Sequence, residues 1–139
     1  MAKTFKLEIV TPEKRFYDGQ AEMVIVQTMK GEEGFKANHA PACMILSAGE
    51  LRIHEPGGKV LIAAASDGFV DVEDNDVMIF VDSAEWPNEI DIDRLKSKKA
   101  ELEENLKHPS DFDIAHIWQF KNTLKKIKVR EKVLAKSKN

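Results

Sequence analysis

An acid pair and a histidine lie close together in the segment GEEGFKANHAP, which runs from Gly31 to Pro41. Glu32, Glu33 and His39 are of types that could transfer protons or bind a metal ion. An acid and an imidazole could equally form hydrogen bonds with the polar surface of another protein. Because glycines and a proline are typical of turns, we expect one irregular loop to carry all three side chains.

A nucleophilic site would need a partner for the histidine. Cys43 follows His39 by four residues, but Pro41 lies between them and argues against a helical face that holds both. Cys43 is the only cysteine, so it forms no internal disulfide and no cysteine cluster for zinc. We interpret it as a small buried hydrophobe in a protein of a reducing, cytoplasmic setting.

No other pattern assembles reactive groups. The four histidines show no metal-ligand spacing, and the chain has no phosphate-binding loop of the Walker type. Glu32 and Glu33 could form a corner of a calcium site, although solvated acids are the commoner interpretation. The sequence therefore predicts no catalytic residue, no metal site, no required cofactor and no enzyme activity.

The elements that would position these residues divide the chain in two. Short segments with alternating apolar residues, such as Phe5, Leu7 and Ile9, predict strands over residues 1–85. Turn signals separate them at Tyr17 to Gly19, at Pro56 to Gly58 and at Asp74 to Asp76. This spacing is typical of a β-sandwich or barrel.

A helical part follows a linker over residues 86–90, which contains Pro87. Asp91 is a good N-cap for a first helix that ends near Lys107, before Pro109. Ser110 is expected to cap a second helix that reaches about Lys136. The predicted fold is therefore α+β, an N-terminal β-sandwich of residues 1–85 followed by an antiparallel two-helix hairpin of residues 91–139.

Charge follows the same division. Residues 90–139 contain 13 basic and 8 acidic residues, a net of +5, whereas residues 1–89 contain 8 and 16, a net of −8. The acidic front argues against a nucleic-acid partner. No signal peptide and no apolar run of membrane-spanning length is present, so we expect no direct bilayer insertion.

The apolar stripes of the two helices are thin. Leu95, Leu102 and Leu106 line one side of the first helix. The second helix carries two stripes, which are Ile117, Phe120, Leu124 and Ile127 on one side and Trp118, Val129 and Val133 on another. One can pair with the first helix, and the other could contact the sandwich or a partner. We expect a marginally stable hairpin that can change its arrangement.

Several segments form a recognisable series along the chain. They include Gly31-Glu32-Glu33-Gly34 with His39-Ala40-Pro41, Ser66-Asp67-Gly68, Ile90-Asp91-Ile92-Asp93-Arg94 and Ile127-Lys128-Val129-Arg130-Glu131. In their order and spacing, these segments resemble the epsilon subunit of bacterial F-type ATP synthase over nearly the full length. Asp67 and Asp71 depart from the family pattern, which has glycine and glutamate at these positions.

The resemblance implies a non-catalytic rotor subunit of the central stalk. It would join the gamma subunit, contact the c ring of the membrane sector and couple proton-driven rotation to ATP synthesis, at the cytoplasmic face of the bacterial inner membrane. Glu32 and His39 match the positions that contact the c ring. The alternative is that these two side chains only stabilise their own loop.

The resemblance also implies regulation by the hairpin. The hairpin would not affect ATP hydrolysis when it is folded against the sandwich. It would inhibit ATP hydrolysis when it is extended toward the alpha and beta subunits. The residues expected to act there are Trp118, Lys125, Lys126, Lys128, Val129 and Arg130. A solvated basic face is the alternative interpretation of the charged residues.

ATP as a regulatory ligand is a further implication, since in some members the motif at Ile90, Asp91 and Arg94 holds ATP. Lys126 matches a basic position of that site. Asn122 and two residues of the first helix, Glu101 and Asn105, replace the other basic positions, which disfavours a triphosphate. The alternative roles are an N-cap for Asp91 and a surface ion pair for Arg94.

A second function class stays open on the sequence. The chain could be a stand-alone β-sandwich module that binds a small ligand or a peptide and carries a helical tail. The two hypotheses differ in one expected feature, because a rotor subunit needs an apolar surface that is exposed when the gamma subunit is absent.

Overall fold

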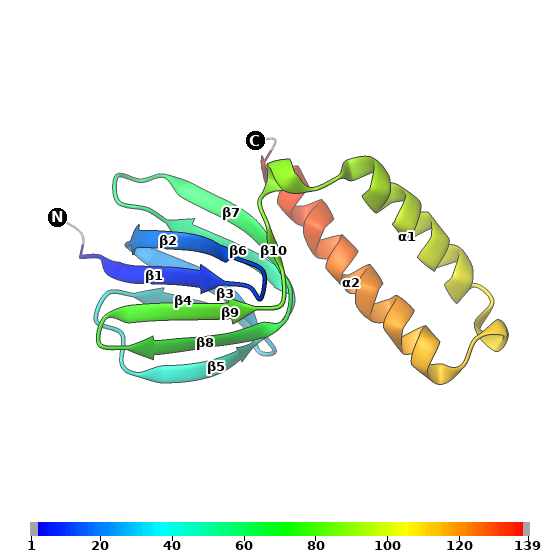
Figure 1. Cartoon of the computed structure of the whole chain (residues 1–139), viewed down its shortest axis with the longest axis horizontal. Helices are drawn as coiled ribbons and strands as arrows, with labels where there is room; N and C mark the ends of the chain where they lie inside the picture. The colour runs from blue at the N-terminus through cyan, green and yellow to red at the C-terminus, as the bar shows by residue number, and fades with distance from the viewer. Residues whose placement is uncertain (1–2, 138–139) are drawn as a thin grey trace.

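The computed structural model describes residues 3–137 and shows a β-rich body with a helical hairpin at one end (Figure 1). The predicted α+β fold is confirmed, with a sandwich first and two helices after it. The last two residues of the predicted 91–139 unit lie outside the described residues.

Within residues 3–137, ten short strands make up the sandwich. They are β1 (Phe5–Val10), β2 (Arg15–Ala21), β3 (Met23–Thr28), β4 (Gly31–Lys36), β5 (Ala42–Leu46), β6 (Gly49–His54), β7 (Val60–Ala65), β8 (Gly68–Glu73), β9 (Asp76–Val81) and β10 (Ala84–Glu85).

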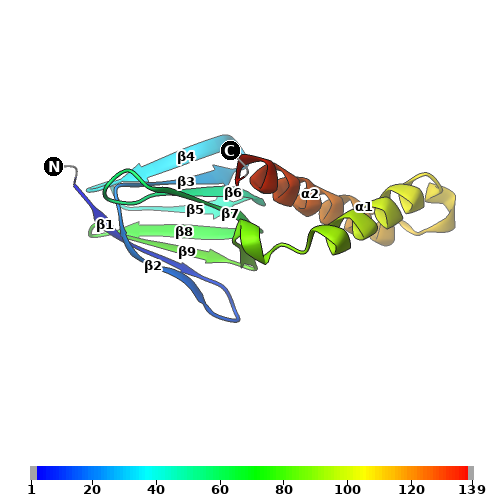
Figure 2. The same cartoon turned by 90° about the horizontal axis from the view of Figure 1, so that it is seen from above.

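The strands run in the order β10-β7-β6-β3-β5-β8-β9-β1-β2, with β4 paired to β3. All pairs are antiparallel except β1 with β9. A single bridge between Thr28 and Leu46 joins β3 to β5, where the sheet folds from one layer into the other. The two layers face each other in Figures 1 and 2.

Alternation along each strand builds the core between the layers. Phe5, Leu7 and Ile9 point inward from β1 and are fully buried, as their spacing predicts. Gly68 begins β8 where a Cβ atom would overlap the carbonyl oxygen of Phe80, so only glycine fits this approach of two strands.

Three local predictions are wrong. Tyr17 to Gly19 is part of β2 rather than a turn, and the chain turns before it, between Thr11 and Lys14. Gly31 to Lys36 is strand β4 rather than part of an irregular loop. Cys43 is exposed, because it faces outward from β5.

The linker is an ordered segment. Pro87–Glu89 forms a 3₁₀ turn, η1. Just before it, the Trp86 ring stacks on Phe16 at 4.3 Å between ring centroids. Glu89 accepts a hydrogen bond from the Trp86 backbone N–H at 2.9 Å. These contacts attach the start of the helical part to β2.

Two helices follow, α1 (Ile92–Leu106) and α2 (Ile114–Ser137). Asp91 caps α1 as predicted, since its carboxylate accepts from the Arg94 N–H at 3.1 Å. Ser110 does not cap α2, because Pro109–Asp111 forms a second 3₁₀ turn, η2. Asp113 takes that role instead and accepts from the His116 N–H at 2.8 Å.

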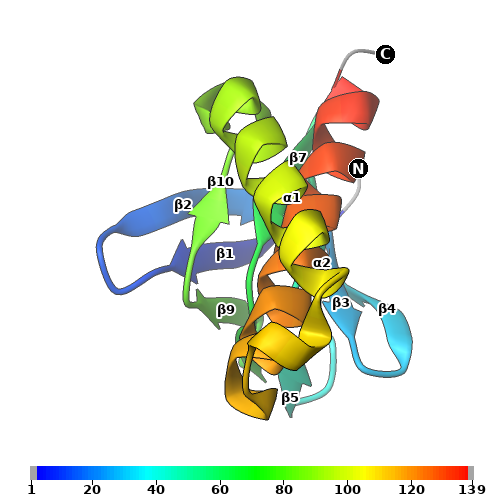
Figure 3. The ribbon, with the colours of Figure 1, turned by 90° about the vertical axis from the view of Figure 1, so that its right-hand side faces the viewer.

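The hairpin lies against one end of the sandwich. α1 packs on α2, and α2 packs on β6 and β7 while the turn between the helices projects away (Figures 1 and 3). The structure is therefore the folded arrangement of the hairpin.

Candidate functional site

An apolar surface lies on the outer side of strands β5, β8 and β9. We call Ile45, Phe69 and Phe80 the apolar sheet face. Ile45 and Phe69 are opposite each other across β5 and β8, and Phe69 and Phe80 are opposite across β8 and β9. The Phe69 and Phe80 rings stack at 4.8 Å, yet 74% of Ile45 and 43% of Phe69 are exposed. An exposed apolar group of this kind is a candidate docking surface.

The two predicted ring-contact residues are not brought together. Glu32 lies in β4 beside the β3–β4 turn, opposite Gln27, whereas His39 follows the far end of the same strand. The prediction of one loop that carries both is wrong, because β4 separates them.

The His39 side chain makes its contacts with residues of its own segment. Its Nδ1 is 2.7 Å from the Ala40 carbonyl oxygen, and its ring packs edge-on against Phe35 at 4.9 Å. These contacts fit the alternative interpretation, in which the imidazole stabilises its own segment.

Glu32 begins a chain of ion pairs that ends on α2. Arg52 bridges two carboxylates, with Glu32 at 2.8 Å and Glu50 at 2.6 Å. Glu50 also pairs with Lys136 at 2.8 Å. Burial raises the pKa of Glu50, but the bonds from Lys136 and Arg52 outweigh it and leave that pKa below its ordinary value. This ion chain links β4, β6 and the last turn of α2.

Apolar contacts and one further ion pair hold α2 on the sandwich. Val133 is fully buried, and it packs in a cluster with Ala64 and Ile62 of β7. Arg130 Nε is 2.6 Å from Glu85 Oε1, and both side chains are partly buried. The folded hairpin therefore has both an apolar and an ionic contact with the sandwich.

The residues predicted to inhibit hydrolysis are divided in this arrangement. Val129 packs toward the sandwich and Arg130 is paired, whereas 69% of Trp118 is exposed on the projecting part of α2. Lys125 and Lys128 line a cleft between α2 and the sandwich, and Lys126 lines a smaller one beside β7. Val129 and Val133 of the predicted stripe therefore pack against other parts of the protein, whereas Trp118 stays exposed.

Three of the four residues predicted to bind a nucleotide line one cleft. A cleft of about 490 Å³ between β10, η1 and the two helices is lined by Ile90, Asp91 and Arg94. Arg130 and Lys98 also line it, but Lys126 does not. Lys126 lines the smaller cleft beside β7 instead, together with Arg130. The cleft also contains the acids Glu85 and Glu89, so it is less positive than a triphosphate requires.

Other reactive arrangements are lacking in the described part of the chain. Within residues 3–137, no group of three or more His, Cys, Asp or Glu side chains could hold a metal ion. None of the helices described there has the length and hydropathy needed to cross a bilayer.

Comparison with known proteins decides the family. A family model described as the ATP synthase delta/epsilon chain, beta-sandwich domain, matches residues 4–87. The ATP synthase epsilon chain of Alkaliphilus oremlandii is 43% identical over 106 residues, which cover 76% of this chain and 78% of the relative. That of Ruminiclostridium cellulolyticum is 44% identical over 103 residues, which cover 74% and 76%.

The chain belongs to the ATP synthase delta/epsilon chain family. The resemblance drawn from the motifs is confirmed, and with it the function of a non-catalytic central-stalk subunit of ATP synthase. Among solved structures, a chain of the Euglena gracilis mitochondrial ATP synthase, in a complex with OSCP, F1 and c-ring, superimposes with a TM-score of 0.83. It is 25% identical, and the match covers 94% of this chain and 81% of that chain.

Sequence reasoning missed the apolar sheet face and the ion chain. The sequence did carry a signal for the apolar sheet face. β5 reads Ala-Cys-Met-Ile-Leu and β8 begins with Gly-Phe-Val, so apolar side chains point to both faces of these strands. One departure from the family pattern is explained by the structure. Asp67 accepts a hydrogen bond from the Ala48 N–H at 3.0 Å and so ties the β7–β8 turn to the chain before β6.

Proposed function

We propose that the sandwich binds the gamma subunit of an ATP synthase through the apolar sheet face. The observation that carries this proposal is the exposure of Ile45 beside the stacked Phe69 and Phe80 rings. Burying this face against a partner would remove apolar surface from water, which is the main driving force of stable association. A stand-alone module has no such need, so the same observation disfavours the alternative function.

The test is capture by tagged gamma subunit of the full chain with Ile45→Asp. A charge at the centre of an interface should weaken binding by about 30-fold or more, since hot-spot side chains contribute about 2 kcal/mol or more. Ile114→Asp is the matched control, because Ile114 is 86% exposed but lies on α2, away from the strands. Equal capture of both variants would contradict the proposal.

The contact with the c ring is assigned in our proposal to Glu32 and the β3–β4 turn. Glu32 has half of its side chain exposed beside Met29, which is 84% exposed at the tip of that turn. His39 lies at the opposite end of β4 and is engaged locally, so its predicted ring contact has less support. The subunit would then sit at the cytoplasmic face of the bacterial inner membrane as part of the assembled enzyme.

The hairpin is proposed to regulate hydrolysis by exchange between the folded arrangement and one extended toward the alpha and beta subunits. Support comes from the few contacts that hold it, which are the cluster around Val133, the Arg130–Glu85 pair and the Lys136–Glu50 pair. Separate modules are part of this proposal, with boundaries as predicted at residues 1–85, 86–90 and 91–139. ATP binding at Ile90, Asp91 and Arg94 stays a prediction.

A further inference from the structure

A single acid, Asp71, lies beside the apolar sheet face. It points to the outer side of β8, as Phe69 does two residues before it. Its neighbours across the strands are Cys43 of β5 and Met78 of β9, and neither carries a basic group. Asp71 is partly buried. A carboxylate therefore lies among apolar side chains at the edge of the surface proposed to bind the gamma subunit.

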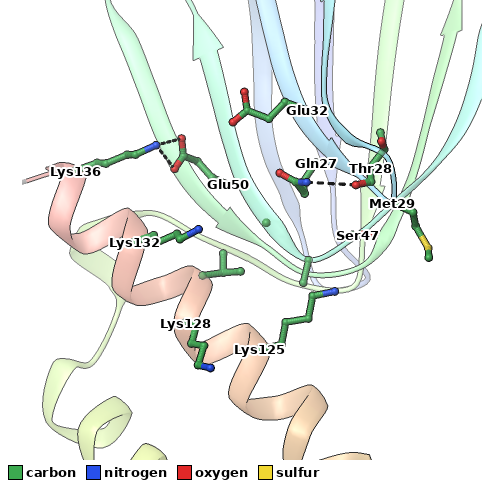
Figure 4. Close-up of a pocket in the computed structure, with 13 residues that line it drawn as sticks. Gln27, Thr28, Met29, Glu32, Ser47, Glu50, Lys125, Lys128, Lys132 and Lys136 are labelled. Atoms are coloured by element: carbon green, nitrogen blue, oxygen red, sulfur yellow. Dashed lines mark hydrogen bonds and ion pairs between the residues drawn. The ribbon is translucent and has the colours of Figure 1, made fainter.

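Several partly buried acids of the sandwich are paired with basic side chains. Glu8 of β1 is 3.1 Å from Lys6 Nζ, and Glu50 of β6 is 2.8 Å from Lys136 Nζ (Figure 4). Asp71 has no such partner, because within residues 3–137 it forms neither an ion pair nor a side-chain hydrogen bond. Its charge is therefore not balanced by the sheet in which it lies.

Water satisfies the Asp71 carboxylate in the free subunit. Every fully buried side-chain polar atom of the described residues 3–137 has a hydrogen-bond partner, so an acid without a partner is one that water still reaches. Two other partly buried acids also lack an ion pair in that part of the chain. Glu22 precedes β3 and Glu33 lies on β4, so neither belongs to the strands of the apolar sheet face.

A partner that covers the apolar sheet face would remove this water. Residues two apart on one strand are about 7 Å apart, so a surface that covers Phe69 also covers Asp71. A carboxylate that loses its water is strongly unfavourable unless a cation or several hydrogen-bond donors replace it. Because no basic side chain of this sheet pairs with Asp71, the replacement has to come from the partner.

We infer that the gamma subunit presents an arginine side chain to Asp71. This inference rests on the proposed function and adds the chemistry of the partner surface, which is an apolar group with one cation at its edge. A guanidinium can form two parallel hydrogen bonds with one carboxylate, and it can also lie over an aromatic ring such as that of Phe69. A lysine ammonium group lacks this planar shape.

Such a pair would determine which partner binds and in which register. The apolar side chains of the face supply most of the driving force, but they do not discriminate strongly between apolar surfaces. A partner that lacks the arginine would leave Asp71 buried and unpaired, which disfavours that complex. Asp71 is thus a specificity-determining residue of the proposed interface.

The test measures the affinity and kinetics with which the full chain and its Asp71→Asn variant bind immobilised gamma subunit. Asparagine keeps the size of the side chain and removes its charge. We expect Kd to rise about 30-fold, mainly through faster dissociation, since a desolvated charge pair that loses one charge costs about 2 kcal/mol or more. If the partner only covered Asp71 with apolar surface, the variant would bind more tightly, because no unpaired charge would be desolvated. An unchanged or lower Kd would therefore overturn the inference.

Glu73→Gln is the matched control, because Glu73 lies on the same strand and face as Asp71 but is exposed. It should raise Kd about fivefold at most, the range for exposed ion pairs. Equal losses in both variants would indicate general attraction between charged surfaces and would contradict a specific pair. The free Asp71→Asn chain should unfold at the wild-type temperature, and a lower one would show that Asp71 acts within its own chain.

Ile45→Asp in the same assay separates this inference from the proposed function. If Ile45→Asp binds as tightly as the wild type, the proposed binding face is wrong and the inference is wrong with it. If Ile45→Asp loses binding while Asp71→Asn does not, the binding face is supported and only the arginine pair is wrong.

Chemical modification of the complex identifies the partner group. Phenylglyoxal reacts with accessible arginine side chains, and mass spectrometry locates the modified residues. We expect one arginine of the gamma subunit to be protected in the wild-type complex and to become reactive in the complex with Asp71→Asn. If the two complexes show the same set of modified arginines, the assignment of an arginine to Asp71 is wrong.

Discussion

Glu50 accepts bonds from Arg52 of its own strand and from Lys136 of α2, at 2.6 and 2.8 Å. Only about an eighth of its side chain is exposed, so the pairs are poorly screened by solvent. Because the folded-state pKa of Glu50 lies below its ordinary value of 4.5, the pairs stabilise the fold above that value. Their contribution is lost as the pH falls through the lowered pKa.

Glu50→Gln should therefore destabilise the protein at pH 7 by about 1.5–3 kcal/mol, the usual contribution of hydrogen bonds to charged groups. The difference between wild type and variant should shrink toward zero as the pH falls from about 4.5 through the lowered pKa of Glu50 in the folded protein. Urea unfolding at pH 7, 5 and 3.5 measures both. Glu73→Gln is the control on an exposed acid, and a difference that stays constant with pH would contradict the ionic role of Glu50.

Residue identities also show what sequence reasoning can and cannot supply. Asp91 was predictable as an N-cap because capping depends on local backbone only. The exposure of Cys43 and Ile45 was not, because the direction of a side chain in β5 depends on which face of the sheet is buried. Lys126 matched a motif position, yet it lines the smaller cleft beside β7 and not the cleft that Asp91 and Arg94 line.

Strands and helices were predictable where their patterns were strong. β1 and β6 follow clear alternation and β9 is a continuous apolar run, and each formed as expected. β4 has the polar, glycine-containing sequence Gly-Glu-Glu-Gly-Phe-Lys, which reads as a loop. It is a strand because all six residues pair with β3, a tertiary effect that overrides local propensity. That strand separates the two residues that the sequence had placed on one loop.

Removal of the hairpin tests the proposed division into modules. A chain ended after Glu89 keeps the Trp86–Phe16 stack and the Trp86–Glu89 hydrogen bond, so we expect a folded sandwich that still binds the gamma subunit. Stability should fall somewhat, because Ile62 and Ala64 of β7 lose the apolar cover of α2. Circular dichroism and capture by tagged gamma subunit measure the two outcomes. An unfolded truncation, or one that no longer binds, would show that the two parts are one unit.

In the whole enzyme, the Arg130–Glu85 pair exists only when the hairpin is folded. Glu85→Gln weakens that pair but leaves every residue of the hairpin unchanged. If the extended hairpin inhibits hydrolysis, this variant should be more strongly inhibited than the wild type, since the population shifts away from the folded arrangement. Hydrolysis by the reconstituted ATP synthase measures the effect.

The companion variant replaces Lys125, Lys126 and Lys128 by Gln and should act in the opposite direction if charge holds the extended hairpin to the alpha and beta subunits. Arg130 is left unchanged, because it pairs with Glu85 in the folded arrangement. Exposed pairs are worth about 0.2–1 kcal/mol each, so three would shift the balance by roughly 0.6–3 kcal/mol. The release should weaken as salt rises. Trp118→Ala is the comparison for an apolar contact, and release by that variant alone would contradict the electrostatic account.

The two helices differ in length, and this sets how far the regulatory segment can travel. α1 has 15 residues and α2 has 24, which at about 1.5 Å per residue correspond to about 22 and 36 Å. A hairpin that swings about Ile90 as one body reaches little beyond the length of α2. If the segment from Lys107 to Asp113 also straightens, the helices lie end to end and span about 58 Å. The closed turn at Pro109 therefore limits how far the hairpin can reach. A hairpin with this turn closed could contact only nearby subunits, and one with the turn open could contact distant ones.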